Sequence, residues 1–337
     1  MRETHFSSSV PERFQWSLKI DLLGDFNKWM YRQLINKGYK NVTEKDVPYQ
    51  FFNMRKRELI PKPRKVIYSK EFAYPAEYQL ALQEFEEKAK AGMDLTPYMS
   101  EKIVDCNYND LLLNDWGIYH FHLSRRYKDN GFVQRNEYQI FAYESDDTIY
   151  MLQVYRHDAP ALYSKQEMIR IMHDNWPAIT ESHHLKGVSK LDWKSNDEEY
   201  GKLRNSYVQT LVELGENEVY GILGGGYASN GYSSEAFQAL AYWERKFTHY
   251  QERIIENAGN IGEAINKYHS NFDLFSDMNI WFIGFASEDI LTLIEKNSGL
   301  IIQMFAEQHF FRICRANEID VLNDRTQGKT SVLLMGM

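Results

Sequence analysis

Two histidines at alternate positions of a short apolar run are the residues best suited to acid–base chemistry. The run WGIYHFHLSRR covers residues 116–126 and holds His120, His122, Arg125 and Arg126. Imidazole can take up or release a proton near neutral pH, because its unperturbed pKa is about 6.5. Arginine carries a permanent charge on a planar group that matches phosphate and carboxylate oxygens. The run therefore suggests proton transfer beside an anion.

The orientation of these side chains follows from the strand that residues 116–123 are predicted to form. Successive side chains of a strand point to opposite faces, so Tyr119, Phe121 and Leu123 share one face and the two histidines lie on the other. The apolar face is predicted to be core. We therefore expect the histidine face to be the less buried one.

Further elements must surround this strand. Residues 136–145 and 148–157 predict two more strands, joined at Asp146 and Asp147 into a hairpin. A helix is predicted over 75–92, between Pro75 and Gly92, and a second short helix over about 101–114. Another helix is expected at 164–176, and the basic stretch 55–65 is expected to be an extended connector because it contains two prolines.

This order of elements resembles the RelE/ParE superfamily of small bacterial toxins, including its HigB branch. The resemblance rests on VIYSKEF (66–72) as an opening strand, two helices, the hairpin 136–158, and Arg156 with His157 at the hairpin's end. It covers roughly residues 66–160, and the chain is longer than free toxins of this family. The resemblance implies a metal-independent endoribonuclease in a toxin–antitoxin or phage-defence setting. It also implies RNA as substrate and an antitoxin or another protein as partner.

The implied reaction is attack of a ribose 2′-hydroxyl on the neighbouring phosphate. It needs a base, an acid and cations around the phosphorane. The family's strand residues correspond here to Arg135, Tyr155, Arg156 and His157, and the stretch 55–65 could follow an RNA backbone. Together with the histidine strand, the candidate catalytic residues are His120, His122, Tyr155, Arg156 and His157, and the candidate substrate-binding residues are Arg125, Arg126 and Arg135. No cofactor and no metal are expected.

Three alternatives use the same residues differently. The histidines and arginines could be ordinary polar side chains on the open face of a sheet. His120 and His122 could instead chelate a divalent metal with His157 and Asp158, because imidazole is a common zinc and iron ligand. A third alternative is a non-enzymatic binding or assembly protein whose glycine-rich loop and aromatic surface contact a partner or a small ligand.

A glycine-rich loop is the second candidate site. The stretch GILGGGYASNGYSSEA (221–236) lies between a predicted strand and a predicted helix, an order that can direct backbone amides at an anion. It lacks the Gly-Lys-Ser/Thr of a phosphate-binding P-loop. The candidate ligand residues are Gly224, Gly225, Gly226 and Tyr227. The alternative is a turn that enters a helix capped by Ser233 or Ser234.

Bulk properties bound the partners and the compartment. The net charge of −8 argues against generic nucleic-acid binding, so RNA contact would need a local basic patch. The two cysteines, Cys106 and Cys314, argue against a disulfide framework and favour a cytoplasmic location. No apolar run approaches the roughly 18–20 residues that span a bilayer, so no membrane partner is expected.

The predicted fold class is α+β, in three parts. These are an N-terminal helical or extended segment at 1–60, the RelE-like helix–sheet module at 61–190, and a C-terminal α/β domain at 200–337 with the glycine-rich loop. A helix is predicted within residues 17–38. In the last part, strands at 278–286 and 310–316 are predicted on either side of a helix at about 287–304.

Overall fold

The chain has the predicted α+β fold and divides into two compact units. The structure, a computed structural model, describes residues 2–7, 15–215, 218–268, 277–287, 290–305 and 310–316. Unit 1 consists of residues 1–52 and 238–337, and unit 2 consists of residues 53–237. These boundaries differ from the three consecutive segments predicted, because strands from the two ends of the chain share one sheet.

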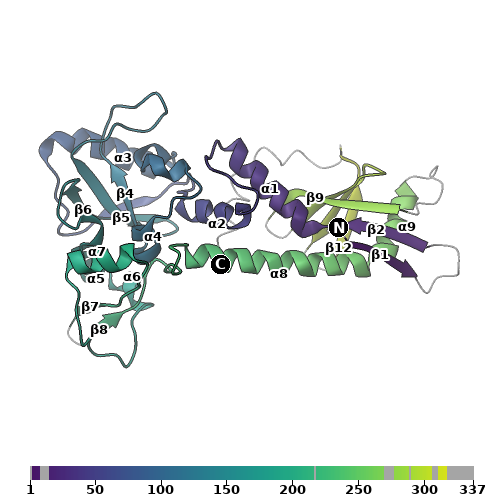
Figure 1. The fold of residues 1–337 in the computed structure, drawn as a ribbon. Helices are drawn as coiled ribbons and strands as arrows, with labels where there is room; N and C mark the ends of the chain where they lie inside the picture. Colours follow the sequence, from purple (N-terminus) through teal and green to yellow (C-terminus); the bar gives the residue numbers. More distant parts are fainter. Residues whose placement is uncertain are drawn as a thin grey trace. The chain divides into compact units, whose positions relative to one another are not determined.

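Unit 1 contains a six-stranded sheet (Figure 1). Its strands are ordered β1-β2-β9-β10-β11-β12, and all neighbours are antiparallel except β2 and β9, which run parallel. The strands are β1 (Arg2–Ser7), β2 (Gln15–Ile20), β9 (Asp277–Ser287), β10 (Ile290–Glu295), β11 (Ile301–Phe305) and β12 (Phe310–Cys314). The N-terminal strands are thereby tied to the C-terminal part of the chain.

Aromatic packing holds the helices of unit 1 to its sheet. The helices that follow β2 or precede β9 along the chain are α1 (Leu22–Asn36), α2 (Val47–Arg57), α8 (Ser234–Glu256) and α9 (Ala258–Tyr268). Phe26 of α1 stacks on Phe247 of α8 with ring centroids 4.1 Å apart, and meets Phe282 of β9 edge-on at 6.0 Å. The helix predicted within residues 17–38 begins at Leu22, because the preceding residues belong to β2.

The prediction of a helix at about 287–304 is wrong. Two antiparallel strands, β10 and β11, occupy this segment, with a turn at Gly299, whose φ is +70°. Burial alternates along β10, where Leu291 and Leu293 are buried. This two-residue period is typical of a strand with one face packed on the core. The β-branched residues of the segment also favour a strand.

Unit 2 is built on a four-stranded sheet ordered β3-β6-β5-β4 (Figure 1). Its strands are β3 (Lys65–Tyr68), β4 (Ile118–His122), β5 (Tyr138–Glu144) and β6 (Thr148–Arg156), and a separate hairpin joins β7 (Val212–Gly215) to β8 (Glu218–Tyr220). The β3–β6 pair is parallel, and the other two pairs are antiparallel. The predicted hairpin of residues 136–157 is confirmed.

Short helices surround this sheet. They are α3 (Gln79–Ala91), α4 (Leu111–Trp116), α5 (Glu167–Asn175), α6 (Pro177–Glu181) and α7 (Asp197–Asn205), with 3₁₀ turns at Ala76–Tyr78, Thr96–Tyr98, Glu101–Val104 and Leu162–Ser164. The helix predicted over 75–92 is confirmed as a 3₁₀ turn followed by α3, which ends at Gly92 in the left-handed conformation. The second predicted helix is instead a 3₁₀ turn and the later helix α4.

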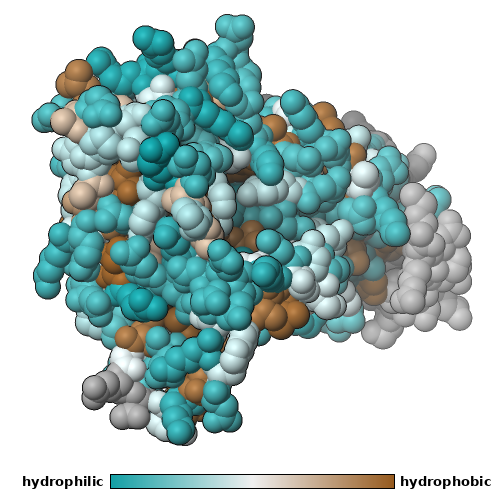
Figure 2. Space-filling view, turned by 60° about the vertical axis from the view of Figure 1, so that its left-hand side comes forward, coloured by the Kyte–Doolittle hydropathy of each residue, from teal (hydrophilic) through white to brown (hydrophobic). Residues whose placement is uncertain are grey.

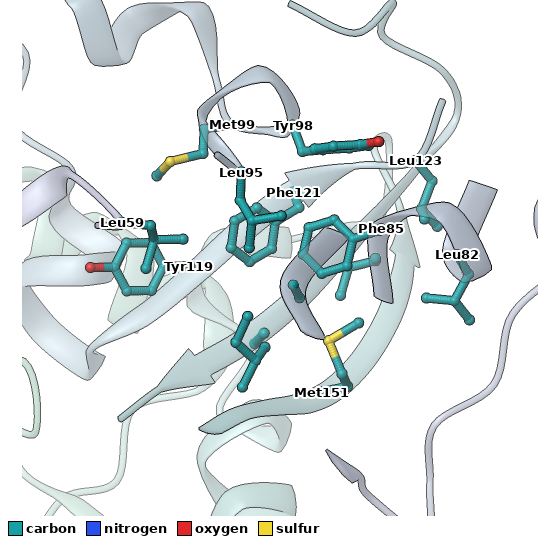
Figure 3. Packing of buried hydrophobic residues seen from close by; sticks show 14 of the residues in the cluster. Leu59, Leu82, Phe85, Leu95, Tyr98, Met99, Tyr119, Phe121, Leu123 and Met151 are labelled. Carbon is teal, nitrogen blue, oxygen red and sulfur yellow. The ribbon is translucent and has the colours of Figure 1, made fainter. Parts of the chain in front are cut away.

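Apolar side chains cover both faces of the unit 2 sheet. On one face, Phe85 of α3 and Tyr98 pack on Phe121, together with Tyr119 (Figure 3). On the other face, side chains of α5 and α7 pack with residues of β4, β5 and β6 in a second apolar cluster. The members of this cluster are Leu112, Trp116, Ile118, Phe141, Leu152, Leu162, Met168, Ile169, Ile171, Met172, Tyr200, Val212 and Leu223. Every residue of β4 is therefore buried.

The described helices contain no segment long and apolar enough to cross a membrane. Hydrophilic residues cover most of the face drawn in Figure 2, and the apolar residues between them lie in separate small groups. Scattered apolar residues of this kind are ordinary on a protein surface.

Candidate functional site

The two histidines of β4 lie inside unit 2, so the prediction that their face is the less buried one is wrong. His120 is 9% exposed and His122 is 3% exposed. Their face belongs to the second apolar cluster, where Phe141 of β5 pairs with His120 across the sheet. The ring of Tyr163, in the 3₁₀ turn Leu162–Ser164, meets the His120 ring edge-on with centroids 5.4 Å apart.

Each buried imidazole has one nitrogen without a hydrogen-bond partner among the described residues. These atoms are Nδ1 of His120 and Nε2 of His122. The second ring nitrogen of His122, Nδ1, lies 3.5 Å from Nε2 of Gln139. A buried polar atom without a partner costs about 1–3 kcal/mol, so such atoms in a folded protein call for an explanation. A ligand or a role in proton transfer would supply one.

Burial also keeps both rings uncharged. It is the main cause that lowers the pKa of His120, and it lowers the pKa of His122 to about 4. Electrostatic interaction with Arg135 and His157 also lowers the pKa of both rings, while Asp110 raises the pKa of His120. At neutral pH each ring is thus a neutral group that can donate one proton and accept another.

His120 also borders a small pocket. The pocket is lined by Arg57, Met99, Ser100, Ile103, Tyr108, Asp110, Leu113, Tyr119 and His120. Asp110 caps α4, where its Oδ1 accepts from the backbone nitrogen of Leu113 at 3.1 Å. The guanidinium of Arg57 lies 5.4 Å from the centroid of the Tyr108 ring, and burial raises the pKa of Tyr108 above its usual range. The pocket therefore brings an imidazole, a phenol, a carboxylate and a guanidinium together.

The candidate residues at the end of the β5–β6 hairpin are only partly connected to the histidines of β4. The hydroxyl of Tyr155 donates to Glu167 Oε2 at 2.8 Å. Arg156 is exposed and makes two hydrogen bonds of 3.0 Å to Asp158. His157 is exposed as well, and its imidazole interacts electrostatically with both buried histidines.

The three candidate substrate-binding arginines lie on the segment between β4 and β5. Arg125 donates to Glu84 Oε2 at 3.3 Å. The segment folds back on itself, because the carbonyl of Arg126 accepts from the backbone nitrogen of Gln134 at 2.7 Å. Arg126 and Arg135 are exposed, and the charge of Arg135 lowers the pKa of both histidines. Arg135 is thus linked electrostatically to the histidines of β4.

The basic stretch 55–65 is largely engaged in structural contacts, and contact of this stretch with RNA stays a prediction. Its first three residues, Arg55, Lys56 and Arg57, end α2 and are buried, so this part is not the extended connector predicted. Three later cations form ion pairs, which are Lys62–Asp146, Arg64–Glu144 and Lys65–Asp147. The positive charge of the stretch is thus largely engaged within unit 2.

The glycine-rich loop packs tightly against α4. A Cβ at Gly224 would lie 2.1 Å from the carbonyl oxygen of Leu113, a distance that the backbone cannot tolerate. The amides of Gly224 and Gly226 donate to the carbonyls of Asp115 and Asn114 at 2.8 and 2.7 Å. These amides are used in packing, and ligand binding by the loop stays a prediction.

The residues after these glycines also have structural contacts. Gly225 and Gly226 have φ values of +79° and +84°, which glycine adopts readily. Tyr227 is buried, and its hydroxyl donates to the carbonyl of Val208 at 3.3 Å. Ser233 caps α8 as predicted, since its Oγ accepts from the backbone nitrogen of Ala236 at 3.3 Å.

The residues that complete the pocket were not predicted from the sequence. Arg57 and Tyr108 come from segments before β4 and carry no motif. Asp110 had a local signal, because an aspartate before the apolar run of α4 is a typical helix cap. Gln139 and Tyr163 have no sequence pattern that would single them out.

Within the described ranges, no three His, Cys, Asp or Glu side chains are grouped so that they could hold a metal ion. The proposed set of His120, His122, His157 and Asp158 is therefore not such a group. Comparisons of the chain with protein-family models, with curated proteins and with solved structures found no match.

Proposed function

We propose that unit 2 is an RNA-cleaving enzyme that needs no metal ion, with His120 as the group that moves the proton. One observation carries the proposal: Nδ1 of His120 has no partner among the described residues, and the same ring borders a pocket with Arg57, Tyr108 and Asp110. The lowered pKa of His120 leaves its ring unprotonated near neutral pH, which is the form that a general base requires.

The reaction would proceed by attack within the RNA strand. His120 accepts the proton of a ribose 2′-hydroxyl, and the oxygen attacks the adjacent phosphorus. The 5′-oxygen of the next nucleotide leaves with a proton from an acid, and the products are a 2′,3′-cyclic phosphate and a 5′-hydroxyl. By the resemblance, His157 is the proposed acid and Arg135 the proposed cation beside the phosphate, and both side chains interact electrostatically with the histidines of β4.

Arg156 has a further place in this proposal. Its ion pair with Asp158 is exposed, and exposed pairs contribute little to stability because water and salt screen them. A phosphate could therefore take the position of Asp158 at little cost. Lys102 and Lys128, whose charges act on His120 and His122 respectively, would add to a local basic surface on an acidic chain.

The resemblance to RelE/ParE toxins supports the same proposal. The strand β3, the helices α3 and α4, and the strands β4, β5 and β6 follow one another in the order on which the resemblance rests. By that resemblance, we propose a toxin–antitoxin or phage-defence setting, with an antitoxin or another protein as the partner and the cytoplasm as the location.

The test is RNA cleavage by the purified chain in the presence of a chelator. We expect cleavage that yields 2′,3′-cyclic phosphate ends. His120→Gln should lower the rate by about 100-fold or more, as for the loss of a general base. Phe141→Leu is the matched control, because it loosens the same buried layer and keeps the imidazole.

Two results would contradict the proposal. One is RNA that stays intact with the wild-type chain, which would favour a non-enzymatic binding or assembly role. The other is a His120→Gln chain as active as Phe141→Leu.

A further inference from the structure

A chain of three polar side chains crosses the buried face behind the pocket. The hydroxyl of Tyr163 donates to Oε1 of Gln139 at 3.1 Å, and Nε2 of the same amide lies 3.5 Å from Nδ1 of His122. Gln139 is 1% exposed and pairs with His122 across β4 and β5. The amide is therefore held between a phenol on one side and an imidazole on the other.

The direction of this chain decides which nitrogen of His122 carries the proton. The structure places Oε1 of Gln139 on the Tyr163 hydroxyl and the NH₂ group of the same amide toward His122. An amide NH₂ only donates, so Nδ1 of His122 must offer a lone pair. A neutral imidazole with a lone pair on Nδ1 carries its hydrogen on Nε2, and this is the atom that has no partner among the described residues.

We infer that Tyr163 and Gln139 are positioning residues that hold His122 as the Nε2–H tautomer. In this form His122 is an uncharged hydrogen-bond donor for an oxyanion, such as a phosphoryl oxygen, and is not the base. The two histidines of β4 thus have different tasks: His120 takes the proton, and His122 donates to the developing charge. This division of tasks rests on the proposed function, whereas the tautomer itself does not.

The turn that carries Tyr163 is fixed from several sides. The carbonyl oxygen of Tyr163 accepts from the Arg204 guanidinium, which is itself buried and paired with Asp115 at 2.7 Å. Ala161, two residues earlier, has φ +48°, a left-handed conformation that residues other than glycine rarely adopt. Such strain persists only where the surroundings impose it, and it is frequent beside functional groups. The hydroxyl of Tyr163 is thereby held in a fixed position beside Gln139.

Burial, with the charges around His122, lowers the pKa of its ring and keeps it neutral. His120, its neighbour on β4, disfavours protonation, as do Arg135 and Lys128 on the segment before β5 and His157 after β6. A neutral ring is the condition under which one tautomer can act as a donor.

Nitrogen NMR of the whole chain with ¹⁵N-labelled histidine tests the tautomer directly. Long-range proton–nitrogen correlations distinguish Nε2–H, Nδ1–H and doubly protonated rings, and His122→Gln assigns the signals. We expect the Nε2–H form of His122 at pH 7. Observation of the Nδ1–H form or of an imidazolium in the wild-type chain would overturn the inference.

Two variants test the part of Gln139 and Tyr163. Gln139→Glu replaces the NH₂ donor by a carboxylate that accepts from Nδ1–H, so the tautomer should reverse. Tyr163→Phe keeps the ring over His120 but releases the amide, so both tautomers should be populated. An unchanged Nε2–H signal in folded Tyr163→Phe and Gln139→Glu chains would contradict the positioning role.

Cleavage assays separate this inference from the proposed function. If the chain cleaves RNA, Gln139→Glu should lower kcat by about 100-fold with little change in KM, as for the loss of one donor to a developing oxyanion. If RNA stays intact while the Nε2–H form is observed, the proposed function fails and the positioning of His122 stands. A reversed tautomer with full kcat would overturn the donor task of His122.

Discussion

Replacement of His122 by glutamine should remove much of the acid sensitivity of unit 2. The pKa of this imidazole falls from 6.5 to about 4 on folding, mainly because the ring is buried. The unfolded chain therefore binds a proton that the folded chain does not, so this stability is present above pH 6.5 and is lost as the pH falls toward 4. Between pH 7 and pH 5 the loss from this one group is about 2 kcal/mol.

Hydrogen exchange of peptides from residues 118–144 measures this effect in unit 2 alone. Protection of the wild-type amides relative to His122→Gln should fall by about 30-fold between pH 7 and pH 5, the factor that corresponds to 2 kcal/mol. His120 acts in the same direction and is present in both chains; because the two rings interact, the difference between the chains reports His122 together with this interaction. His249→Gln, an exposed change on α8, is the control and should leave the pH dependence unchanged. Equal loss of protection in wild type and His122→Gln would refute the reasoning.

Three further changes test the packing by thermal unfolding. Arg204→Met leaves Asp115 buried without its cation and should cost about 3–5 kcal/mol, whereas adding Asp115→Asn should restore part of the loss. Gly224→Ala places a Cβ against the carbonyl of Leu113 and should cost at least about 1–3 kcal/mol. Gly259→Ala meets only open space on α9 and should stabilise unit 1 by about 0.5–1 kcal/mol. A lower melting temperature for Gly259→Ala, or unchanged ones for the other two, would contradict these assignments.

Local patterns predicted much of unit 2. The alternation of Tyr119, Phe121 and Leu123 with the histidines identified β4 and its two faces, and Asp146 with Asp147 marked the turn of the hairpin. Pro75 and Gly92 bounded the region of α3 because they act on the backbone of their own segment. Signals of this kind depend only on neighbouring residues.

The burial of the histidine face could not be predicted in this way. Alternation shows which residues share a face, but a second layer of side chains decides whether that face meets water. Here the layer comes from segments far along the chain, such as those of Met168 and Tyr200. The partners of the histidines were missed for the same reason, because the contact of Gln139 with His122 depends on strand register.

The helix wrongly predicted over 287–304 has a different cause. Apolar residues are frequent on both sides of this segment, and a short apolar run fits a strand or a helix equally well. The Asn-Ser-Gly sequence at 297–299 was a usable turn signal that would have divided the segment into two strands. The pairing of β2 with β9, by contrast, has no local signal.

Because β2 pairs with β9, β2 lacks this neighbouring strand for much of the time that the chain is being synthesised. Ser17 aligns with Asp277, so Leu18 and Ile20 emerge from the ribosome long before the strand that completes their side of the sheet. At about 5–20 residues per second the delay is roughly 10–50 s, while all of unit 2 is translated in between. During this interval β2 is an open sheet edge of the kind that invites association with other chains. A nascent chain stalled before β9 would thus be a natural client for chaperones.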